Sequence, residues 1–146
     1  MPVFIYIGGG ILFFFILIVI VKILAKKRTA QVLKKFKDKN IVRISSSANF
    51  FGLQSKGSGQ VRGNGILVLT KNKIYFEMWL PKKVIDIPIS KIVKVDTVKS
   101  HLKKTKFKPL LKITFTHEDG NKDSAAWLVN NTQEWRDGIK KLAGKL

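Results

Sequence analysis

An unbroken apolar stretch covers residues 3–21, VFIYIGGGILFFFILIVIV, and its only polar group is the hydroxyl of Tyr6. As a helix it would be about 28 Å long, close to the hydrocarbon thickness of a bilayer. A helix in a soluble core would carry a polar stripe at helical spacing, and none is present. A cleaved secretory signal is the alternative, but no basic residue precedes the stretch and Leu24-Ala25-Lys26 is a poor cleavage site. The pattern therefore predicts a retained transmembrane anchor at residues 1–25.

A strongly cationic segment, residues 26–40, follows the apolar stretch. Val32, Leu33 and Phe36 form a narrow apolar stripe in it, which predicts that the helix continues, either as a solvated stalk or lying on lipid headgroups. Basic residues beside a span remain on the cytoplasmic side, so the N-terminus is expected outside and the rest of the chain in the cytoplasm. The juxtamembrane basic residues are Lys26, Lys27, Arg28, Lys34 and Lys35.

From Ile41 onward the pattern changes to short apolar runs typical of strands. Two antiparallel hairpins are predicted, across Lys71-Asn72-Lys73 and across the Asp119-Gly120 turn, because such short connections permit only antiparallel pairing. The strands expected from these runs cover residues 49–53, 66–70, 74–80, 84–87, 93–98, 110–116 and 122–129.

Helical spacing returns at the end of the chain, where Trp135, Ile139 and Leu142 share one face. Asn131 followed by Glu134 predicts a capping box at the start of this helix. The expected fold class is mainly β (α+β): an N-terminal single transmembrane helix, then a bent antiparallel sheet or barrel capped by the C-terminal α-helix, with Trp135 as the plug. Residues 41–146 are long enough for one such domain with one core.

The formal net charge of +19 indicates which class of partner the domain binds. A cytoplasmic domain this basic, tethered beside an anionic leaflet, is attracted by about 1 kcal/mol per well-placed cation. On a free protein the same charge would suggest nucleic acid, but the tether disfavours that partner. Because the chain has no cysteine, it contains neither a disulfide framework nor a thiolate metal site, in agreement with a reducing compartment.

Four stretches occur in a characteristic order: GNGILVLTKNKIYF at 63–76, IDIPISKIVKV at 85–95, LLKITF at 110–115 and NTQEWRDGIKKL at 131–142. Together they resemble the pleckstrin-homology-like (PH-like) superfold, including the lipid-linked GRAM branch, and the span before the domain resembles bacterial membrane-tethered versions.

The resemblance implies a binding module, for phosphoinositides or other acidic lipids in some members and for peptides in others. In lipid-binding members, Lys and Arg of the first two strands and their loop hold headgroup phosphates, which corresponds here to Lys56 and Arg62. The fuller Lys/Arg-x-Arg pattern is missing at 60–62, which argues against stereospecific phosphoinositide recognition.

The loop at 100–109, SHLKKTKFKP, is the strongest candidate for a binding site. Its four lysines surround Phe107, which can enter between headgroups while the ammonium groups meet phosphates. The same composition suits nucleic acid with Phe107 stacked on a base, or a solvated loop with Phe107 packed into the barrel. Lysine outnumbers arginine, which favours diffuse attraction over bidentate recognition. The predicted lipid-binding residues are Lys56, Arg62, Lys103, Lys104, Lys106, Phe107 and Lys108.

No catalytic pattern accompanies these features. The glycine run at 57–65 lacks phosphate-loop spacing and leads into a strand. His101 and His117 lie in separate predicted loops, and a metal site needs at least three converging donors. Asp123 and Asp137 have no predicted partner. We therefore expect no enzyme, no metal, no cofactor and no small-molecule substrate.

The predicted function is a single-pass, membrane-anchored binding or scaffold module that contacts anionic lipid at the cytoplasmic membrane surface. The alternative is a protein-interaction module, for self-association or as a subunit of a membrane complex, in which the basic charge serves topology and solubility. Either partner would meet the domain through its loops, an exposed edge strand or the mouth of the barrel.

Overall fold

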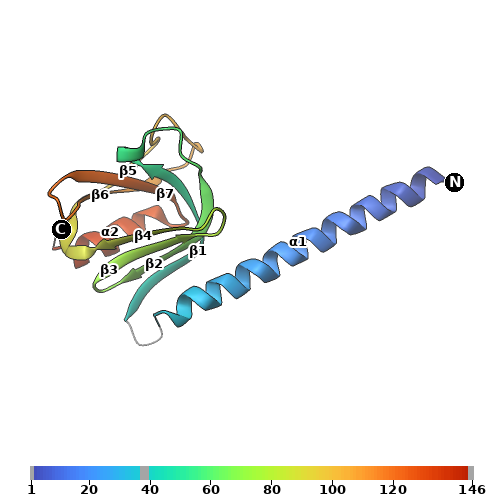
Figure 1. The fold of residues 1–146 in the computed structure, drawn as a ribbon, viewed down its shortest axis with the longest axis horizontal. Helices are drawn as coiled ribbons and strands as arrows, with labels where there is room; N and C mark the ends of the chain where they lie inside the picture. Colours follow the sequence, from blue (N-terminus) through green and yellow to red (C-terminus); the bar gives the residue numbers. More distant parts are fainter. Residues whose placement is uncertain (1, 37–39, 145–146) are drawn as a thin grey trace. The chain divides into compact units, whose positions relative to one another are not determined.

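The computed structural model describes the backbone of residues 2–36 and 40–144. The chain divides into two compact units, residues 1–35 and residues 36–146. The first contains helix α1, and the second contains seven strands and helix α2 (Figure 1).

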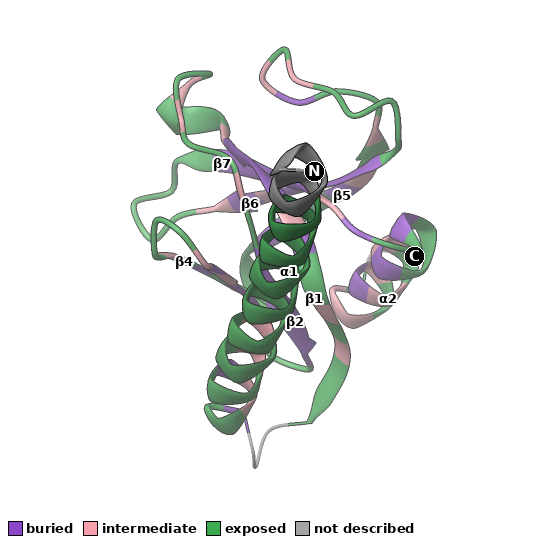
Figure 2. Cartoon of the chain, turned by 90° about the vertical axis from the view of Figure 1, so that its right-hand side faces the viewer, coloured by how far each residue is buried: buried purple, intermediate pink, exposed green. Residues whose placement is uncertain are grey.

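Helix α1 runs without interruption from Pro2 to Lys34. It is the one helix in the described ranges that is long and apolar enough to cross a membrane, and none of its most apolar window is buried. In Figure 2 most of its described length has the colour of exposed residues. The expected continuation of the helix into the basic segment is confirmed as far as Lys34. Residues 37–39 of that segment lie outside the described residues, and the boundaries 1–25, 26–40 and 41–146 stay a prediction.

The second unit is built on one seven-stranded antiparallel sheet of order β4-β3-β2-β1-β7-β6-β5. Both predicted hairpins are confirmed, because Leu69 pairs with Ile74 and Thr116 pairs with Lys122. The strands are β1 (Ile41–Leu53), β2 (Gly63–Thr70), β3 (Lys73–Met78), β4 (Lys83–Pro88), β5 (Ile92–Val98), β6 (Leu110–Thr116) and β7 (Lys122–Leu128). Two short 3₁₀ helices, η1 (Gln54–Lys56) and η2 (Ile89–Lys91), follow β1 and β4, and α2 (Thr132–Leu142) ends the fold.

Strand β1 bends the sheet. Its residues 41–50 pair with β2 and its residues 49–53 pair with β7, so one strand belongs to both halves (Figure 1). Irregular register between Ser45 and Ala48, and again between Phe50 and Gly52, bends it locally. The predicted first strand, 49–53, was therefore too short, because the strand begins at Ile41.

The main core fills the space that the bent sheet encloses. The rings of Phe50, Phe76 and Trp127 pack together with centroids 5.4–5.8 Å apart. Helix α2 adds Trp135 and Ile139, which are 2% and 0% exposed. Trp135 is thus the expected plug, and the predicted PH-like α+β fold, with a long apolar N-terminal helix and a C-terminal helix, is confirmed.

The predicted capping box is wrong. Asn131 does precede α2, but its side chain makes no capping hydrogen bond and its backbone is left-handed, with φ of 54°. Glu134 instead accepts a hydrogen bond from Arg43 at 2.7 Å. Backbone geometry therefore sets the start of α2.

Candidate anion-binding surface

The structure brings the two predicted basic loops together. The β1–β2 loop (residues 54–62) carries Lys56 and Arg62, and the β5–β6 loop (residues 99–109) carries the four lysines and Phe107. The Lys104 ammonium donates to the Gln60 carbonyl at 3.3 Å, and His101 Nε2 lies 3.1 Å from the Gly52 carbonyl oxygen. The β5–β6 loop therefore contacts both the β1–β2 loop and the end of β1.

Gln60 closes the β1–β2 loop from within. Its Nε2 group donates to the carbonyls of Leu53 and Gly57 at 2.7 and 2.6 Å, and its Oε1 accepts from the Leu53 N–H at 3.0 Å. The side chain that stands where the lipid-binding pattern has a cation is thus used to hold the loop. This geometry agrees with the sequence argument against stereospecific phosphoinositide recognition.

A small second core anchors both loops to the outer face of the sheet. Phe51, Leu110 and Ala126 are fully buried there, on the face opposite Phe50. The Arg62 guanidinium lies 4.9 Å from the Phe51 ring centroid, in a cation–π contact. Arg62 therefore packs over this core while its side chain stays exposed.

His101 fixes the β5–β6 loop against β1. Burial lowers its pKa, and the charge of Lys112 adds to this effect, although the Gly52 hydrogen bond and the charge of Asp123 oppose it. The ring is therefore neutral at pH 7, with Nε2–H donating to the Gly52 carbonyl. Gly52 has φ of 115°, a backbone conformation that side chains rarely adopt, so this position beside the loop favours glycine.

Phe107 projects from the surface. Its side chain is 97% exposed, and its backbone is left-handed, with φ of 57°. The Thr105 hydroxyl accepts from the Phe107 N–H at 3.0 Å and donates to the Lys99 carbonyl at 2.8 Å. These bonds hold Phe107 outward, so packing of Phe107 into the barrel is excluded.

The predicted juxtamembrane residues Lys26, Lys27, Arg28 and Lys34 are exposed on α1, and Lys35 is exposed just after it. Phe36, from the apolar stripe of the same segment, is buried instead, and the centroid of its ring lies 5.1 Å from that of Tyr75 within the second unit.

Sequence reasoning missed Lys83, the first residue of β4. Its ammonium lies 3.4 Å from Gln60 Oε1 and 5.0 Å from the Phe50 ring centroid. Burial and then the charge of Lys56 lower the pKa of Lys83, while Asp123 opposes them. The period-two alternation of Lys83 with Ile85 and Ile87 was the signal that could have placed it on the inner face.

The sequence predicts no partner for Asp123, and the structure supplies several. Its carboxylate accepts from the Ser55 N–H and hydroxyl at 2.9 and 2.6 Å, from the Ser124 N–H at 2.8 Å, and contacts His117 Nε2 at 3.3 Å. Burial alone would raise the pKa of Asp123, but these hydrogen bonds lower it below its usual value. Asp137 also has a partner, since Arg136 donates to it at 2.8 Å.

Across the described residues, no three His, Cys, Asp or Glu side chains are placed to hold a metal ion. Asp123 ties η1 to β7 through Ser55, and His117 contacts the same carboxylate.

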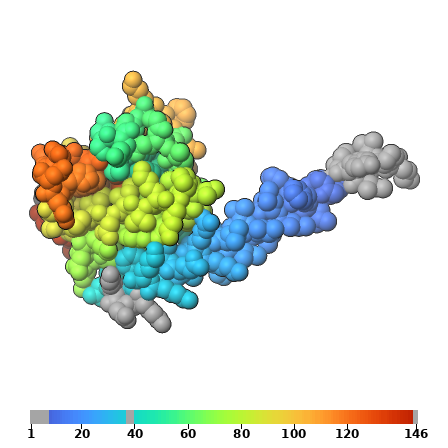
Figure 3. Space-filling view, viewed as in Figure 1, coloured from blue at the N-terminus to red at the C-terminus, as the bar shows by residue number. Residues whose placement is uncertain are grey.

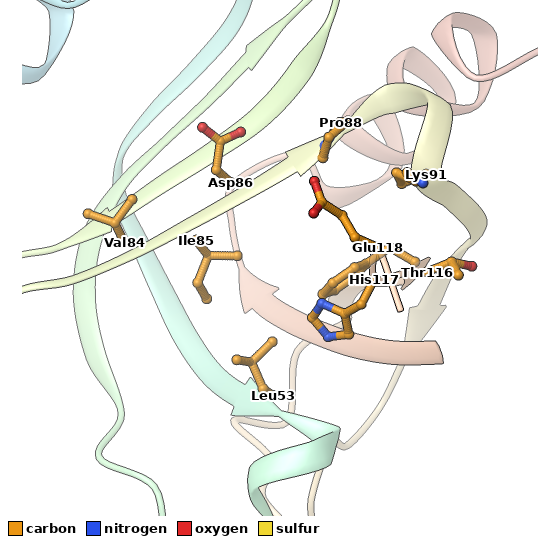
Figure 4. A pocket seen from close by; sticks show the side chains of 10 residues that line it. Leu53, Val84, Ile85, Asp86, Pro88, Lys91, Thr116, His117 and Glu118 are labelled. Atoms are coloured by element: carbon orange, nitrogen blue, oxygen red, sulfur yellow. The ribbon is translucent and has the colours of Figure 1, made fainter. Parts of the chain in front are cut away.

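A groove opens between β4 and the β6–β7 turn (Figure 4). We call it the β4 groove; its volume is about 370 Å³. It is lined by Leu53, Val84, Ile85, Asp86, Pro88, Lys91, Phe115, Thr116, His117 and Glu118.

No protein-family model matches the chain, and no curated protein matches it in sequence. Solved structures match it in fold. A chain of the 8S snRNP assembly intermediate has 9% sequence identity and a TM-score of 0.56, over 73% of this chain and 84% of that one. The C-terminal domain of an unknown protein from Leishmania infantum has 14% identity and a TM-score of 0.54, over 80% of this chain and 98% of that one.

The DH/PH domains of p115-RhoGEF (R399E mutant) match with 11% identity and a TM-score of 0.48, over 84% of this chain and 37% of that one. At such identities the likeness concerns the fold alone. The bent seven-stranded sheet closed by α2 defines the class, a PH-like domain preceded by a long apolar helix.

Proposed function

We propose that the chain is a single-pass membrane protein whose PH-like domain contacts anionic lipid through the β1–β2 and β5–β6 loops. α1 is the retained anchor, with its N-terminus outside, because the basic residues from Lys26 onward follow the span. The domain then acts at the cytoplasmic membrane surface as a binding or scaffold module, as in the bacterial membrane-tethered proteins that the sequence resembles.

The exposure of Phe107 among lysines is the observation that carries this proposal. An almost fully exposed phenylalanine, held outward by Thr105, is costly in water and favourable at a lipid interface. Lys103, Lys106 and Lys108 are exposed on the same loop and can meet phosphate groups around the ring. A surface that joins apolar and cationic groups in this way matches the boundary between headgroups and acyl chains.

The chemistry supports diffuse attraction rather than recognition of one headgroup. Lysine is a point charge, and Arg62 already lies over the Phe51 ring. We therefore expect binding to follow the negative charge density of the membrane and to weaken as salt screens it.

The test uses full-length protein in nanodiscs of phosphatidylcholine, mixed with sucrose-loaded vesicles that are then pelleted. We expect pelleting with vesicles that contain phosphatidylglycerol, a steep decrease with salt, and little pelleting with pure phosphatidylcholine vesicles. Empty nanodiscs serve as the blank. Absence of pelleting with anionic vesicles at low salt would overturn the proposal.

A matched pair of triple variants localises the contact. Glutamate at Lys103, Lys106 and Lys108 should abolish most of the binding, while glutamate at Lys71, Lys122 and Lys141 changes the net charge equally but lies outside the loops. A further variant with glutamine at the five juxtamembrane cations removes their contribution. Equal loss in both triple variants would contradict a defined surface and would mean that the net charge of the domain, and not these loops, makes the contact.

A further inference from the structure

The hydroxyl of Thr105 holds together the exposed part of the β5–β6 loop. Its Oγ1 donates to the Lys99 carbonyl at 2.8 Å and accepts from the Phe107 N–H at 3.0 Å. One side chain therefore connects the start of the loop to the residue that carries the exposed ring. In the space-filling view the gold-coloured atoms of this loop project from the domain (Figure 3).

The backbone that precedes Thr105 forms a tight turn. His101 and Lys104 exchange two backbone hydrogen bonds, of 2.9 and 3.0 Å. Leu102 and Lys103 between them have φ of 51° and 61°, and positive φ at both central residues is the pattern of a type I′ turn. Thr105 follows this turn in a segment that is neither helix nor strand, and it is exposed. Its hydroxyl is therefore accessible at a defined place on the surface.

Cationic side chains flank Thr105 on both sides. Four lysines lie within three residues of it: Lys103, Lys104, Lys106 and Lys108. Among the described residues, none of these four forms an ion pair with a carboxylate. A phosphate group on Thr105 would thus find ammonium groups nearby that no carboxylate has already neutralised, and such a setting favours new charge-assisted hydrogen bonds.

We propose that Thr105 is a phosphorylation site and that its modification releases the β5–β6 loop from the membrane. This inference rests on the proposed function. A protein kinase would transfer the γ-phosphoryl group of a nucleoside triphosphate to Thr105 Oγ1. The new oxygen–phosphorus bond forms, the bond to the β-phosphate breaks, the nucleoside diphosphate leaves, and the hydroxyl proton passes to a base of the kinase.

Phosphorylation changes both properties on which the proposed lipid contact depends. The ester oxygen has no proton to donate, so the bond from Thr105 to the Lys99 carbonyl is lost and Phe107 is held less firmly. The phosphate adds about 1.5–2 negative charges at pH 7 and pairs with the ammonium groups that would otherwise meet lipid phosphates. Phosphorylation of basic segments releases them from anionic membranes in this way.

The first test encodes phosphothreonine at position 105 of the full-length protein in phosphatidylcholine nanodiscs and repeats the pelleting with phosphatidylglycerol vesicles. We expect binding about tenfold weaker than that of the unmodified protein at low salt. Phosphothreonine encoded in place of Ser90, an exposed residue of η2 outside both loops, is the matched control and should have a much smaller effect.

The outcomes separate this inference from the proposed function. Equal binding of the unmodified protein and of the protein with phosphothreonine at 105 would overturn the inference and leave the proposed function intact. Equal weakening by phosphate at 90 and at 105 would also overturn it, because the effect would then follow net charge alone. Absence of binding by the unmodified protein would overturn the proposed function, and the inference with it.

The second test asks whether a kinase reaches the hydroxyl. Full-length protein in phosphatidylcholine nanodiscs is incubated with the catalytic domain of protein kinase C and ATP, and peptide mass spectrometry locates the phosphate. Thr29 is the internal comparison, because it follows Lys26, Lys27 and Arg28 but is held in α1. We expect Thr105 to be modified severalfold faster than Thr29. Absence of phosphate from Thr105 would overturn the assignment.

Discussion

Helices α1 and α2 place the same kinds of side chain in opposite environments. The large apolar side chains from Ile11 to Leu24 are exposed around α1, whereas α2 buries Trp135 and Ile139 on one side and leaves its other side to solvent (Figure 2). The spacing of the apolar residues along each helix explains this difference. An apolar face at helical spacing is covered by one sheet, while a helix without a polar stripe needs apolar surroundings on every side.

Removal of the α2 plug should have the largest effect. Trp135→Ala deletes a side chain that is 2% exposed, so we expect a loss of about 3–5 kcal/mol in the free energy of unfolding of the domain. Chemical denaturation followed by near-UV circular dichroism measures it. Lys141→Ala, at an exposed position of α2, is the control and should change the free energy by less than about 1 kcal/mol. Similar losses in both variants would contradict the assignment of Trp135 as the plug.

A charge placed in α1 should reduce insertion of the helix into a membrane and leave the stability of the domain unchanged. Leu17→Arg places a cation in the middle of the apolar window at a cost of about 2.5–3.5 kcal/mol for insertion. We expect a smaller membrane-integrated fraction after alkaline extraction and an unchanged unfolding free energy of the domain. Leu17→Ala is the matched control. If Leu17→Arg left the integrated fraction unchanged, α1 would not be an anchor.

Acid should affect the domain and not the apolar helix, because the described apolar residues 8–21 contain no ionisable side chain. The pKa of His101 is lowered in the folded domain, so the unfolded chain binds a proton that the folded chain does not as the pH falls below about 6.5. Stability contributed by neutral His101 is present above that pH and is lost below it.

The measurement compares denaturation midpoints at pH 7.5 and pH 5.5 for the wild type and for His101→Asn. Asp123, whose pKa is lowered, stays ionised over this window, and its contribution is lost only as the pH falls below about 3.8. We expect a smaller decrease in the variant than in the wild type. An equal decrease in both would mean that His101 does not cause the acid sensitivity.

Local patterns predicted the elements well, because each depends on neighbouring residues. The hairpin around Lys71-Asn72-Lys73 and the buried Trp135 both follow from spacing alone. The partner of Asp123 could not be predicted, because Ser55 lies 68 residues away and meets it only once the sheet bends. Arg43 and Glu134, 91 residues apart, are a second such pair.

The candidate site shows the same limit. The sequence identified the lysines around Phe107 and the cations of the β1–β2 loop as separate patches. The two patches lie in contact because Lys104 bonds to Gln60 and His101 bonds to Gly52, and the spacing of residues along the chain does not predict these contacts. The outward direction of Phe107 depends on a left-handed backbone that sequence periodicity does not report.

The smallest effect concerns how α2 begins. Serine caps a helix as well as asparagine does, so a side-chain cap at Asn131 would leave Asn131→Ser neutral. The left-handed backbone predicts otherwise: Asn131→Ser should be less stable than Asn131→Gly by about 1 kcal/mol, because glycine alone adopts this conformation without strain. Equal stability of the two variants in chemical denaturation would mean that the side chain, and not the backbone, starts the helix. Helix α1 is predicted from its composition alone, whereas α2 must begin at one residue for Trp135 to reach the core.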